Sequence, residues 1–413
     1  MTRSNPARRP AGPNARVQRI YERRPYPFGD ARALQRSGWQ LSLDWIRSFG
    51  RDGDCPPPGR VLVAGCGDGS EAFSLQRQLP EAEIVAVDFS PRSVALARRL
   101  QRRDPALRRI RFEVADLAAP GLARTLGGTF DLITCHGVLT YVPGPGRVLR
   151  NFAQCLDRRG ALYLGVNGAS HQSGRLRQAL SALGLDLGDF REDARTRSIL
   201  GLCDAVLAGD NFPRISAMGA PYVASDIFGT PNHMFPLSQW TGLARSAGLR
   251  FRASSSSVRI FRLLAEEGKS SQLIPRSRAQ LATLFELLVP ARFHRLIFSL
   301  IPEANPPWQD RRRLYRWTPE RSRLYRFRLP KPGRTVRDRL RSVTISSTAF
   351  DTLTAWRMPE WEVELLRPAA AGRNLENLLD RLPLAIPFAD VRDQLYILHQ
   401  LGIVTLRPPV SPA

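Results

Sequence analysis

A glycine-rich turn between a strand and a helix is the part of this sequence whose residue types and spacing best suit ligand binding. Residues 61–64, Val-Leu-Val-Ala, have the composition of a buried strand, and glycines follow at alternate positions, as Gly65, Gly67 and Gly69. Glycines let the backbone turn tightly and approach a ligand closely, and the following helix start offers free N–H groups. Small residues also fill ordinary turns between strands and helices, so the residues around this turn must decide its role.

Two carboxylates follow the glycine turn, each at the end of a predicted strand. Asp88 ends the strand at 84–88, nineteen residues past Gly69. An acid in this place can accept hydrogen bonds from both hydroxyls of a ribose. Asp116 directly follows the strand at 111–115, where an adenine amino group could be recognised. The turn and the two acids together predict a nucleoside ligand.

Strands and helices alternate throughout the segment that carries these residues. Beyond the three strands already named, we expect strands at 130–135 and 160–166 and helices at 91–102 and 146–156. This alternation is typical of an α/β fold with a doubly wound, Rossmann-like parallel sheet. Ligands bind such a sheet at the carboxyl ends of its strands, so the fold would bring the glycine turn and both acids together.

The combined pattern resembles the class I S-adenosylmethionine-dependent methyltransferases over roughly residues 58–168. A Gly-x-Gly-x-Gly turn in place of Gly-x-Gly-x-x-Gly, together with the acid after the third strand, favours a nucleoside of this kind over a dinucleotide. The resemblance implies S-adenosyl-L-methionine as cofactor and methyl transfer as the reaction. The alternative is a Rossmann domain that binds NAD or has no catalytic role.

The loop after the fourth strand contains the candidate catalytic residue, His136. Residues at this point of the fold line the floor beneath the reactive methyl group. An imidazole there could act as a general base, because its ordinary pKa suits proton removal near neutrality. The alternative is that His136 only shapes the wall or hydrogen-bonds the cofactor. The predicted cofactor-binding residues are Gly65, Cys66, Gly67, Asp68, Gly69, Asp88, Phe89, Asp116, Leu117 and His136.

Four further residues are predicted to line the acceptor side of the site. Tyr21 and Tyr26 lie around a turn in an N-terminal segment, and many methyltransferases place such a segment across the cofactor mouth. The alternative is that the two rings anchor this segment to the core. Tyr141 and Asn167 lie on the loops after the fourth and fifth strands. We expect these four residues and His136 to converge on the sulfonium.

Two short motifs give the resemblance a narrower form. The opening Tyr-Glu-x-x-Pro-Tyr-Pro at 21–27 resembles a group of bacterial methyltransferases, and His-Gly-Val-x-x-x-Val-Pro at 136–143 resembles protein-lysine methyltransferases of the outer-membrane-protein type. This resemblance implies a protein or peptide amine as the acceptor. A small secondary metabolite, an RNA, or no acceptor at all in a cofactor-sensing protein are the alternatives. The order Pro231-Asn232-His233 departs from the group's pattern and gives His233 no role.

The chain is strongly basic, with a formal net charge of +24, and Lys269 and Lys331 are its only lysines. An excess of basic over acidic residues indicates an anionic partner, but nucleic acid is not favoured among the candidates. The segments 312–317 and 322–327 both read Arg-Leu-Tyr-Arg-aromatic. Such a pattern can hold phosphates and stack on bases, whereas the stronger alternative is a pair of strands with one apolar face.

The domain organisation follows from changes in pattern along the chain. We expect the last hairpin of the sheet at 249–253 and 258–264, and two helical stripes at 281–288 and 293–300. Acids on the second helix of the C-terminal module, Asp390 and Asp393, favour protein docking over DNA reading. The predicted domains are a disordered basic arm at 1–18, an N-terminal cover segment at 19–57, a methyltransferase domain at 58–265 with a lid-like insertion at about 169–248, and a mainly helical C-terminal accessory domain at 266–413 that is winged-helix-like at about 370–408.

The five cysteines include no Cys-x-x-Cys pair, so we expect buried thiols in a reducing compartment and no metal site. The sequence has no apolar run at its N-terminus that would predict a secretory signal. The most apolar long stretch, 281–301, is interrupted by charged residues and a proline. These features predict a cytoplasmic protein without a transmembrane segment.

Overall fold

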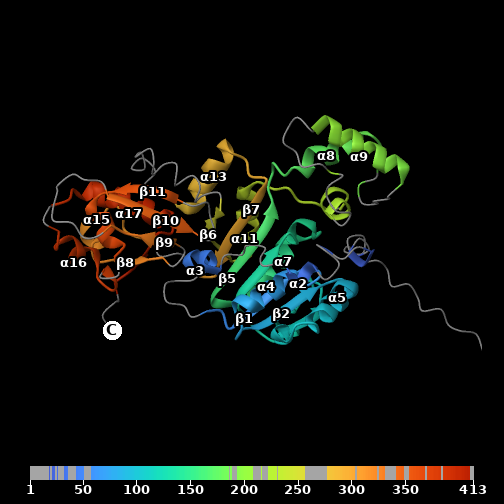
Figure 1. Ribbon diagram of the computed structural model, residues 1–413, viewed down its shortest axis with the longest axis horizontal. Helices are drawn as coiled ribbons and strands as arrows, with labels where there is room; N and C mark the ends of the chain where they lie inside the picture. The colour runs from blue at the N-terminus through green and yellow to red at the C-terminus, as the bar shows by residue number, and fades with distance from the viewer. Residues whose placement is uncertain are drawn as a thin grey trace, which may run out of the picture.

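The structure is a computed structural model, shown in Figure 1. It describes residues 18, 21–23, 26, 32–35, 43–50, 57–185, 187, 193–207, 215, 222–229, 231–255, 277–302, 305–322, 325–330, 341–347, 353–367, 370–382 and 385–409. The predicted basic arm at 1–18, apart from its last residue, lies outside the described residues, as do Cys55 and the strand predicted at 258–264.

A seven-stranded sheet in the order β3-β2-β1-β4-β5-β7-β6 forms the centre of the molecule. The first five strands run parallel, and β7 lies antiparallel between β5 and β6. This arrangement confirms the predicted doubly wound α/β fold. The strands are β1 (Arg60–Ala64), β2 (Glu83–Asp88), β3 (Ile110–Val114), β4 (Phe130–His136), β5 (Leu156–Asn167), β6 (Arg250–Ser254) and β7 (Phe293–Ser299).

Helices cover both faces of the sheet, so its strands are apolar on both sides. Along β1, Val61 and Val63 face one core cluster, whereas Leu62 and Ala64 face the other. This alternation is the two-residue period of a strand, with both faces buried as a parallel sheet requires. The first cluster takes side chains from α3 (Leu43–Gly50), α4 (Ser70–Gln78) and α5 (Pro91–Gln101), and the second from α6 (Leu122–Thr125), α7 (Pro145–Cys155) and α11 (Leu237–Ser246).

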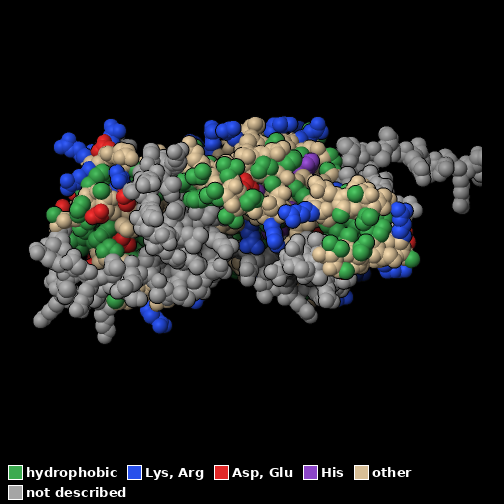
Figure 2. Space-filling view, turned by 90° about the horizontal axis from the view of Figure 1, so that it is seen from above, with side chains coloured by type: hydrophobic (Ala, Val, Ile, Leu, Met, Phe, Trp, Pro, Cys, Tyr) green, Lys and Arg blue, Asp and Glu red, His purple; other side chains and the backbone are tan. Residues whose placement is uncertain are grey.

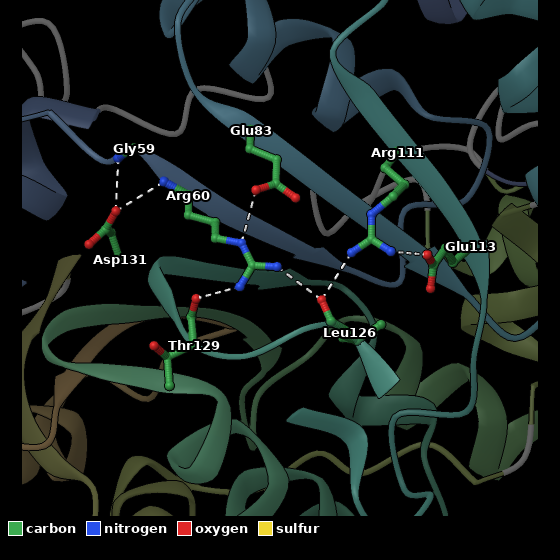
Figure 3. A network of polar contacts seen from close by, with 8 residues as sticks. All are labelled: Gly59, Arg60, Glu83, Arg111, Glu113, Leu126, Thr129 and Asp131. Carbon is green, nitrogen blue, oxygen red and sulfur yellow. Dashed lines mark hydrogen bonds and ion pairs between the residues drawn. The ribbon is translucent and has the colours of Figure 1, made fainter. Parts of the chain in front are cut away.

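The edge of the sheet at which the parallel strands begin is held by arginines (Figure 3). Arg60 Nε contacts Glu83 at 3.0 Å, and its Nη1 and Nη2 donate to the carbonyl oxygens of Thr129 and Leu126. Asp131 Oδ2 accepts from the N–H groups of Gly59 and Arg60, each at 2.9 Å. These contacts join β1, β2 and the start of β4, and they leave the opposite edge for a ligand.

The helix predicted over 293–300 is wrong, because residues 293–299 form β7. Leu296, Ile297 and Phe298 are fully buried in succession and serve the two core clusters alternately. A strand covered on both faces reads as a continuous apolar run, which periodicity cannot tell from a buried helix. The sheet therefore takes its last strand from beyond residue 265, where the predicted methyltransferase domain ends. The helix predicted at 281–288 is present as α13 (Arg278–Leu288).

The predicted insertion contains helices that share a small core of their own. Leu176 and Leu180 of α8 (Ser173–Ala182) and Cys203 of α9 (Ala194–Leu207) belong to it. Val223 and Ile227 of the π-helical turn η5 (Val223–Ile227) join them. Figure 1 shows α8 and α9 at one end of the molecule and the C-terminal elements at the other.

The C-terminal part combines helices with short strands. Near its end lie two helices and a strand, α16 (Leu375–Leu379), α17 (Phe388–Gln400) and β12 (Val404–Arg407), and β12 pairs with β8 (Thr318–Arg321). A separate sheet has the order β11-β10-β9, and the two remaining helices are short. These elements are β9 (Tyr325–Arg328), β10 (Arg341–Ser347), β11 (Leu353–Met358), α14 (Arg311–Leu314) and α15 (Glu360–Leu365).

The arginine–aromatic repeat is not a pair of like strands, because its first copy starts in α14, whereas the described end of its second copy, 325–327, lies in β9. Tyr315, Trp317 and Tyr325 are all buried in the core, so their rings have no free face for a base. On the described part of the face in Figure 2, arginine side chains lie in separate groups. No helix among the described residues is long and apolar enough to cross a membrane.

Candidate active site

The glycine turn after β1 has the backbone geometry that its sequence predicts. Gly65, Gly67 and Gly69 have φ values of 79°, 52° and 90°, which are unfavourable for residues with a side chain. The N–H groups of Gly65 and Cys66 both donate to the carbonyl oxygen of Val87. A Cβ on Gly65 would lie 2.3 Å from a methyl carbon of Val138, so the loop after β4 packs directly on the turn. Only glycine fits at this position.

Asp88, at the end of β2, is held in place by backbone donors. Its Oδ2 accepts from the N–H of Gly67 and its Oδ1 from the N–H of Ser90, each at 2.9 Å. Burial raises the pKa of Asp88 to about 6, although these hydrogen bonds oppose the rise. An ionised carboxylate can accept about four hydrogen bonds, so each oxygen retains capacity for a ligand hydroxyl.

The N-terminal segment is docked at the end of β2. Gln18 Nε2 donates to the carbonyl oxygen of Phe89 at 3.0 Å, and the rings of Tyr21 and Phe89 meet edge to face at 5.9 Å. Ser90 Oγ donates to Glu22 at 2.8 Å. Gln18, Tyr21 and Glu22 therefore lie beside the predicted ribose site.

A cavity of about 400 Å³ opens at the carboxyl edge of the sheet and brings most predicted site residues together. This volume lies in the usual range for small-ligand sites. Asp68 and Gly69 do not line it: Asp68 is buried behind the turn, and Gly69 precedes α4. The predicted residues that line it are Tyr21, Tyr26, Gly65, Cys66, Gly67, Asp88, Phe89, Asp116, Leu117, His136, Tyr141 and Asn167.

His136 stands over β5 with its ring plane fixed by two contacts. Its Nδ1 lies 2.9 Å from Tyr163 Oη, and the two rings are nearly parallel, at 8°. A Cβ on Gly165 would lie 2.4 Å from His136 Nδ1, so the imidazole occupies the space that this glycine leaves. The hydrogen bond to Tyr163 fixes the orientation of the His136 ring. Nδ1 is unprotonated where Tyr163 donates this bond, and it carries a proton where Nδ1 donates it.

Tyr141 reaches across to the insertion and contacts a carboxylate that sequence reasoning missed. Its Oη donates to Asp226 Oδ1 at 2.5 Å, and Ser225 Oγ donates to Asp226 Oδ2 at 2.9 Å. Burial raises the pKa of Asp226 to about 6 and that of Tyr141 well above its usual value. The only signal in the sequence was the lack of a regular pattern over 222–236, which predicts a long irregular loop, and such loops are more often functional than not.

Asn167 and His233 also fasten the insertion to the sheet. Asn167 Nδ2 donates to Asn232 Oδ1 at 3.1 Å, and Asn232 Nδ2 donates to the carbonyl oxygen of Asp226 at 2.9 Å. His233 Nε2 lies 2.9 Å from the carbonyl oxygen of Val142, and its N–H donates to the carbonyl oxygen of Thr140. These bonds give Asn167 and His233 a structural task at the rim of the cavity.

Glu71 is a second acid that the sequence reasoning missed, although it stands two residues past Gly69. Burial raises the pKa of Glu71 to about 7, and its Oε1 has no hydrogen-bond partner within the described residues. Phe293 and Arg295 of β7 line the same cavity and were hidden by the wrong helix prediction. The other lining residues are Ser70, Gly137, Val138, Val142, His171, Gln172, Tyr222, Ser225 and Asp226.

Metal ligands do not gather in the described ranges, where no three His, Cys, Asp or Glu side chains are arranged to hold an ion. Cys66, Cys135, Cys155 and Cys203 are buried free thiols. Burial raises the pKa of Cys66 well above its usual value, so this thiol in the cavity wall stays protonated at neutral pH.

Comparisons with known proteins find similarity to methyltransferases. Residues 62–162 match a family model described as a methyltransferase domain. An uncharacterized protein of Synechococcus sp. is 31% identical over 188 residues, which are 45% of this chain and 44% of that protein. A ubiquinone biosynthesis O-methyltransferase of Albidiferax ferrireducens is 29% identical over 136 residues, 32% of this chain and 49% of that protein. The chain spans about half the length of these curated relatives.

Among solved structures, PKMT2 from Rickettsia typhi in complex with AdoHcy has a similar fold. The TM-score is 0.51 at 15% identity, over 89% of this chain and 76% of that one. The matched family, the strand order and the glycine turn show that the chain carries a class I S-adenosylmethionine-dependent methyltransferase domain. The resemblance inferred from the sequence and its cofactor, S-adenosylmethionine, are thereby confirmed.

The residues of the cavity fit this cofactor. The glycine turn leaves room that a Cβ would fill, and Asp88 presents oriented carboxylate oxygens where ribose hydroxyls bind in this fold. Asp116 and Leu117 line the cavity beyond the end of β3.

Proposed function

We propose that this protein transfers the methyl group of S-adenosylmethionine to an amine of a protein or peptide. The observation that carries the proposal is one cavity lined by the glycine turn, by Asp88 and Asp116, and by the acceptor-side residues Tyr141 and Asp226. In it, Gly65 and Gly67 would admit the amino-acid end of the cofactor, Asp88 would bind the ribose, and Asp116 or its neighbour Leu117 the adenine.

The cofactor supplies an electrophilic methyl group on a positively charged sulfur. The task of the chain is then to hold a nucleophile in line with that group, at about 3 Å, and such placement supplies a large share of the barrier reduction. We assign Tyr21, Tyr26, Tyr141 and Asn167 to the acceptor side and His136 to the floor. His136 would serve as general base if the ring presents an unprotonated nitrogen to the acceptor.

Calorimetry with S-adenosylmethionine and S-adenosylhomocysteine tests cofactor binding. Asp88→Ala should lower the affinity at least tenfold, since hydrogen bonds to a charged group contribute about 1.5–3 kcal/mol each. Glu83→Ala is the matched control, because Glu83 lies at the other end of β2 in a half-exposed ion pair with Arg60. The proposal fails if neither compound binds or if Asp88→Ala binds as the parent does.

The acceptor is proposed on separate grounds. An amine is supported by the motifs shared with lysine methyltransferases and by the fold similarity to PKMT2, a protein lysine methyltransferase. A small-molecule hydroxyl is the second candidate, supported by the ubiquinone biosynthesis O-methyltransferases among the relatives. Methyl-labelled cofactor incubated with cell lysate, followed by separation into protein, RNA and small molecules, distinguishes them. Label confined to the small-molecule fraction would replace the amine by the second candidate.

A further inference from the structure

Asp226 is the acid on the acceptor side of the cavity, and it belongs to a different part of the chain from the cofactor residues. It lies on η5 in the insertion and is 9% exposed. Tyr21, Asp88 and Asp226 all line the same cavity. Burial raises the pKa of Tyr21, and the charge of Asp226 raises it further.

Four tyrosines line the cavity together with Asp226, as does Arg295 of β7. The tyrosines are Tyr21, Tyr26, Tyr141 and Tyr222. Burial is the main cause of the raised pKa of Tyr21, Tyr141 and Tyr222, so these phenols are neutral at physiological pH. Neutral aromatic rings around a carboxylate are the surroundings in which proteins bind ammonium groups.

Among the described residues, no ion pair joins the Asp226 carboxylate to a cationic side chain. Its oxygens accept from the hydroxyls of Tyr141 and Ser225. Arg177, which holds the same turn, donates from Nη1 to the carbonyl oxygens of Ile227 and Gly229. A buried carboxylate without a cationic partner is costly, and a bound ammonium would offset that cost.

We propose that Asp226, oriented by Tyr141 and Ser225 and flanked by Tyr21, forms the binding site for the ammonium group of the acceptor. This inference rests on the proposed function, because it assigns the acceptor half of the same cavity. The rival explanation is that the Tyr141–Asp226 bond only fastens the insertion to the sheet. The two explanations differ in the role of the negative charge on Asp226. A hydrogen bond that only fastens the insertion to the sheet needs no charge, whereas binding an ammonium group does.

The test uses two probes that differ only in the ammonium group. Nα-acetyl-lysine methylamide carries it, and Nα-acetyl-norleucine methylamide ends in a methyl group instead. Their binding to the full-length protein is measured by calorimetry with and without S-adenosylhomocysteine. We expect the lysine probe to bind the parent at least tenfold more tightly than the norleucine probe. Equal affinity, or no binding of the lysine probe, overturns the inference.

Two substitutions separate the charge from the hydrogen bond. Asp226→Asn retains an acceptor for Tyr141 but removes the charge, and it should lower the affinity for the lysine probe about tenfold or more. Tyr141→Phe is the comparison variant, which breaks the bond and keeps the charge, so it should weaken binding of the lysine probe clearly less than Asp226→Asn does. Equal losses in both variants would support a fastening role and overturn the inference.

S-Adenosylhomocysteine affinity keeps the two proposals distinguishable. It should stay within twofold of the parent in Asp226→Asn, which also shows that this variant is folded. If the cofactor product binds no form of the protein, the proposed methyl transfer fails, whereas the comparison of the two probes on the free protein still decides the ammonium site. If Asp226→Asn does not fold, the preference of the parent for the lysine probe decides the inference alone.

Discussion

Asp88 has two tasks, because it orders the glycine turn and lines the cavity where the ribose is predicted to bind. Its carboxylate accepts from the N–H groups of Gly67 and Ser90. Both donors favour the charged form, but burial outweighs them and raises the pKa to about 6. The ionisation of this side chain is therefore sensitive to pH in a range where most aspartates stay charged.

Cofactor affinity should accordingly fall as the pH drops through about 6. Protonation removes lone pairs that the ribose hydroxyls and the turn N–H groups need, so the charged form of Asp88 is the binding form. We expect S-adenosylhomocysteine to bind the parent at least several-fold more weakly at pH 5 than at pH 7.5. Asp88→Asn should bind weakly at both values. Calorimetry across this range checks the prediction, and parallel pH curves for the two proteins would contradict it.

His136 allows a kinetic test of its role. If it is the base, His136→Ala should lower turnover at least a hundredfold with little change in cofactor affinity, because general-base catalysis contributes about 10²–10⁴. The rate of the parent should fall at acid pH as the base becomes protonated, and the variant should lose that acid limb of the profile.

Tyr163→Phe is the companion variant for His136. It removes the hydroxyl that lies 2.9 Å from Nδ1 and keeps the stacked ring. A positioning role for this bond predicts reduced turnover with the pH limb retained. A modest effect of His136→Ala that does not depend on pH would leave His136 as a wall residue.

The positions of single residues could be predicted best where a short sequence pattern determines them. The glycine turn and Asp88 follow from one strand, one turn and the next strand, and the cavity contains both. Asp226 meets Tyr141 across a separation of 85 residues, and no pattern within either segment indicates that pairing. Glu71 was within reach of sequence reasoning, since an acid in the first turn of α4 must point near the glycine turn.

At the scale of elements, the strand β7 shows where periodicity stops being informative. The same run of apolar residues suits a buried helix or a strand covered on both faces. Only its partners decide, because β7 fills the space between β5 and β6 along nearly its whole length. The error mattered for the site, since Phe293 and Arg295 line the cavity from this strand.

The turn after β1 offers a matched pair of substitutions. Gly65 and Gly137 both have positive φ values, 79° and 68°, but a Cβ on Gly65 would meet Val138 at 2.3 Å, whereas one on Gly137 would meet nothing within 4 Å. Gly137→Ala should therefore cost about 1 kcal/mol of unfolding free energy from backbone strain.

Gly65→Ala should cost more, by about 1–3 kcal/mol beyond its control, because the turn and the loop after β4 must also move apart. The same movement should weaken cofactor binding. Denaturant unfolding of both variants measures the difference. Equal losses of unfolding free energy would show that Val138 yields without cost.

At the scale of the whole molecule, the C-terminal elements share a core with one face of the sheet. The Arg278 side chain, on α13, donates to the carbonyl oxygen of His399 at 2.9 Å and to Gln400 Oε1 at 3.1 Å, both on α17. A Cβ on Gly402 would lie 2.4 Å from the Phe49 ring of α3. The predicted division at residue 265 remains a proposal, but the described elements on its two sides are packed against each other.

Glu362 makes the stability of this assembly depend on pH. It lies on α15 at 1% exposure, and its Oε1 has no hydrogen-bond partner within the described residues. Burial raises the pKa of Glu362 to about 8, above the usual value near 4.3 that the unfolded chain provides. The folded state thus binds more protons than the unfolded state between these values. The contribution to stability is fully present below pH 4.3 and is lost as the pH rises through about 8.

Glu362→Gln should remove this loss, since the amide is neutral at every pH. The parent should lose unfolding free energy between pH 5 and pH 8, and the variant should lose less, by about 1 kcal/mol or more, given about 1.4 kcal/mol for each pKa unit. Glu364→Gln is the control on the same helix, because Glu364 is partly exposed and paired with Arg367 at 2.6 Å. Urea unfolding at the two pH values measures all three proteins. If Glu362→Gln has the same pH dependence as the parent, the carboxyl group is already solvated or paired in the folded state.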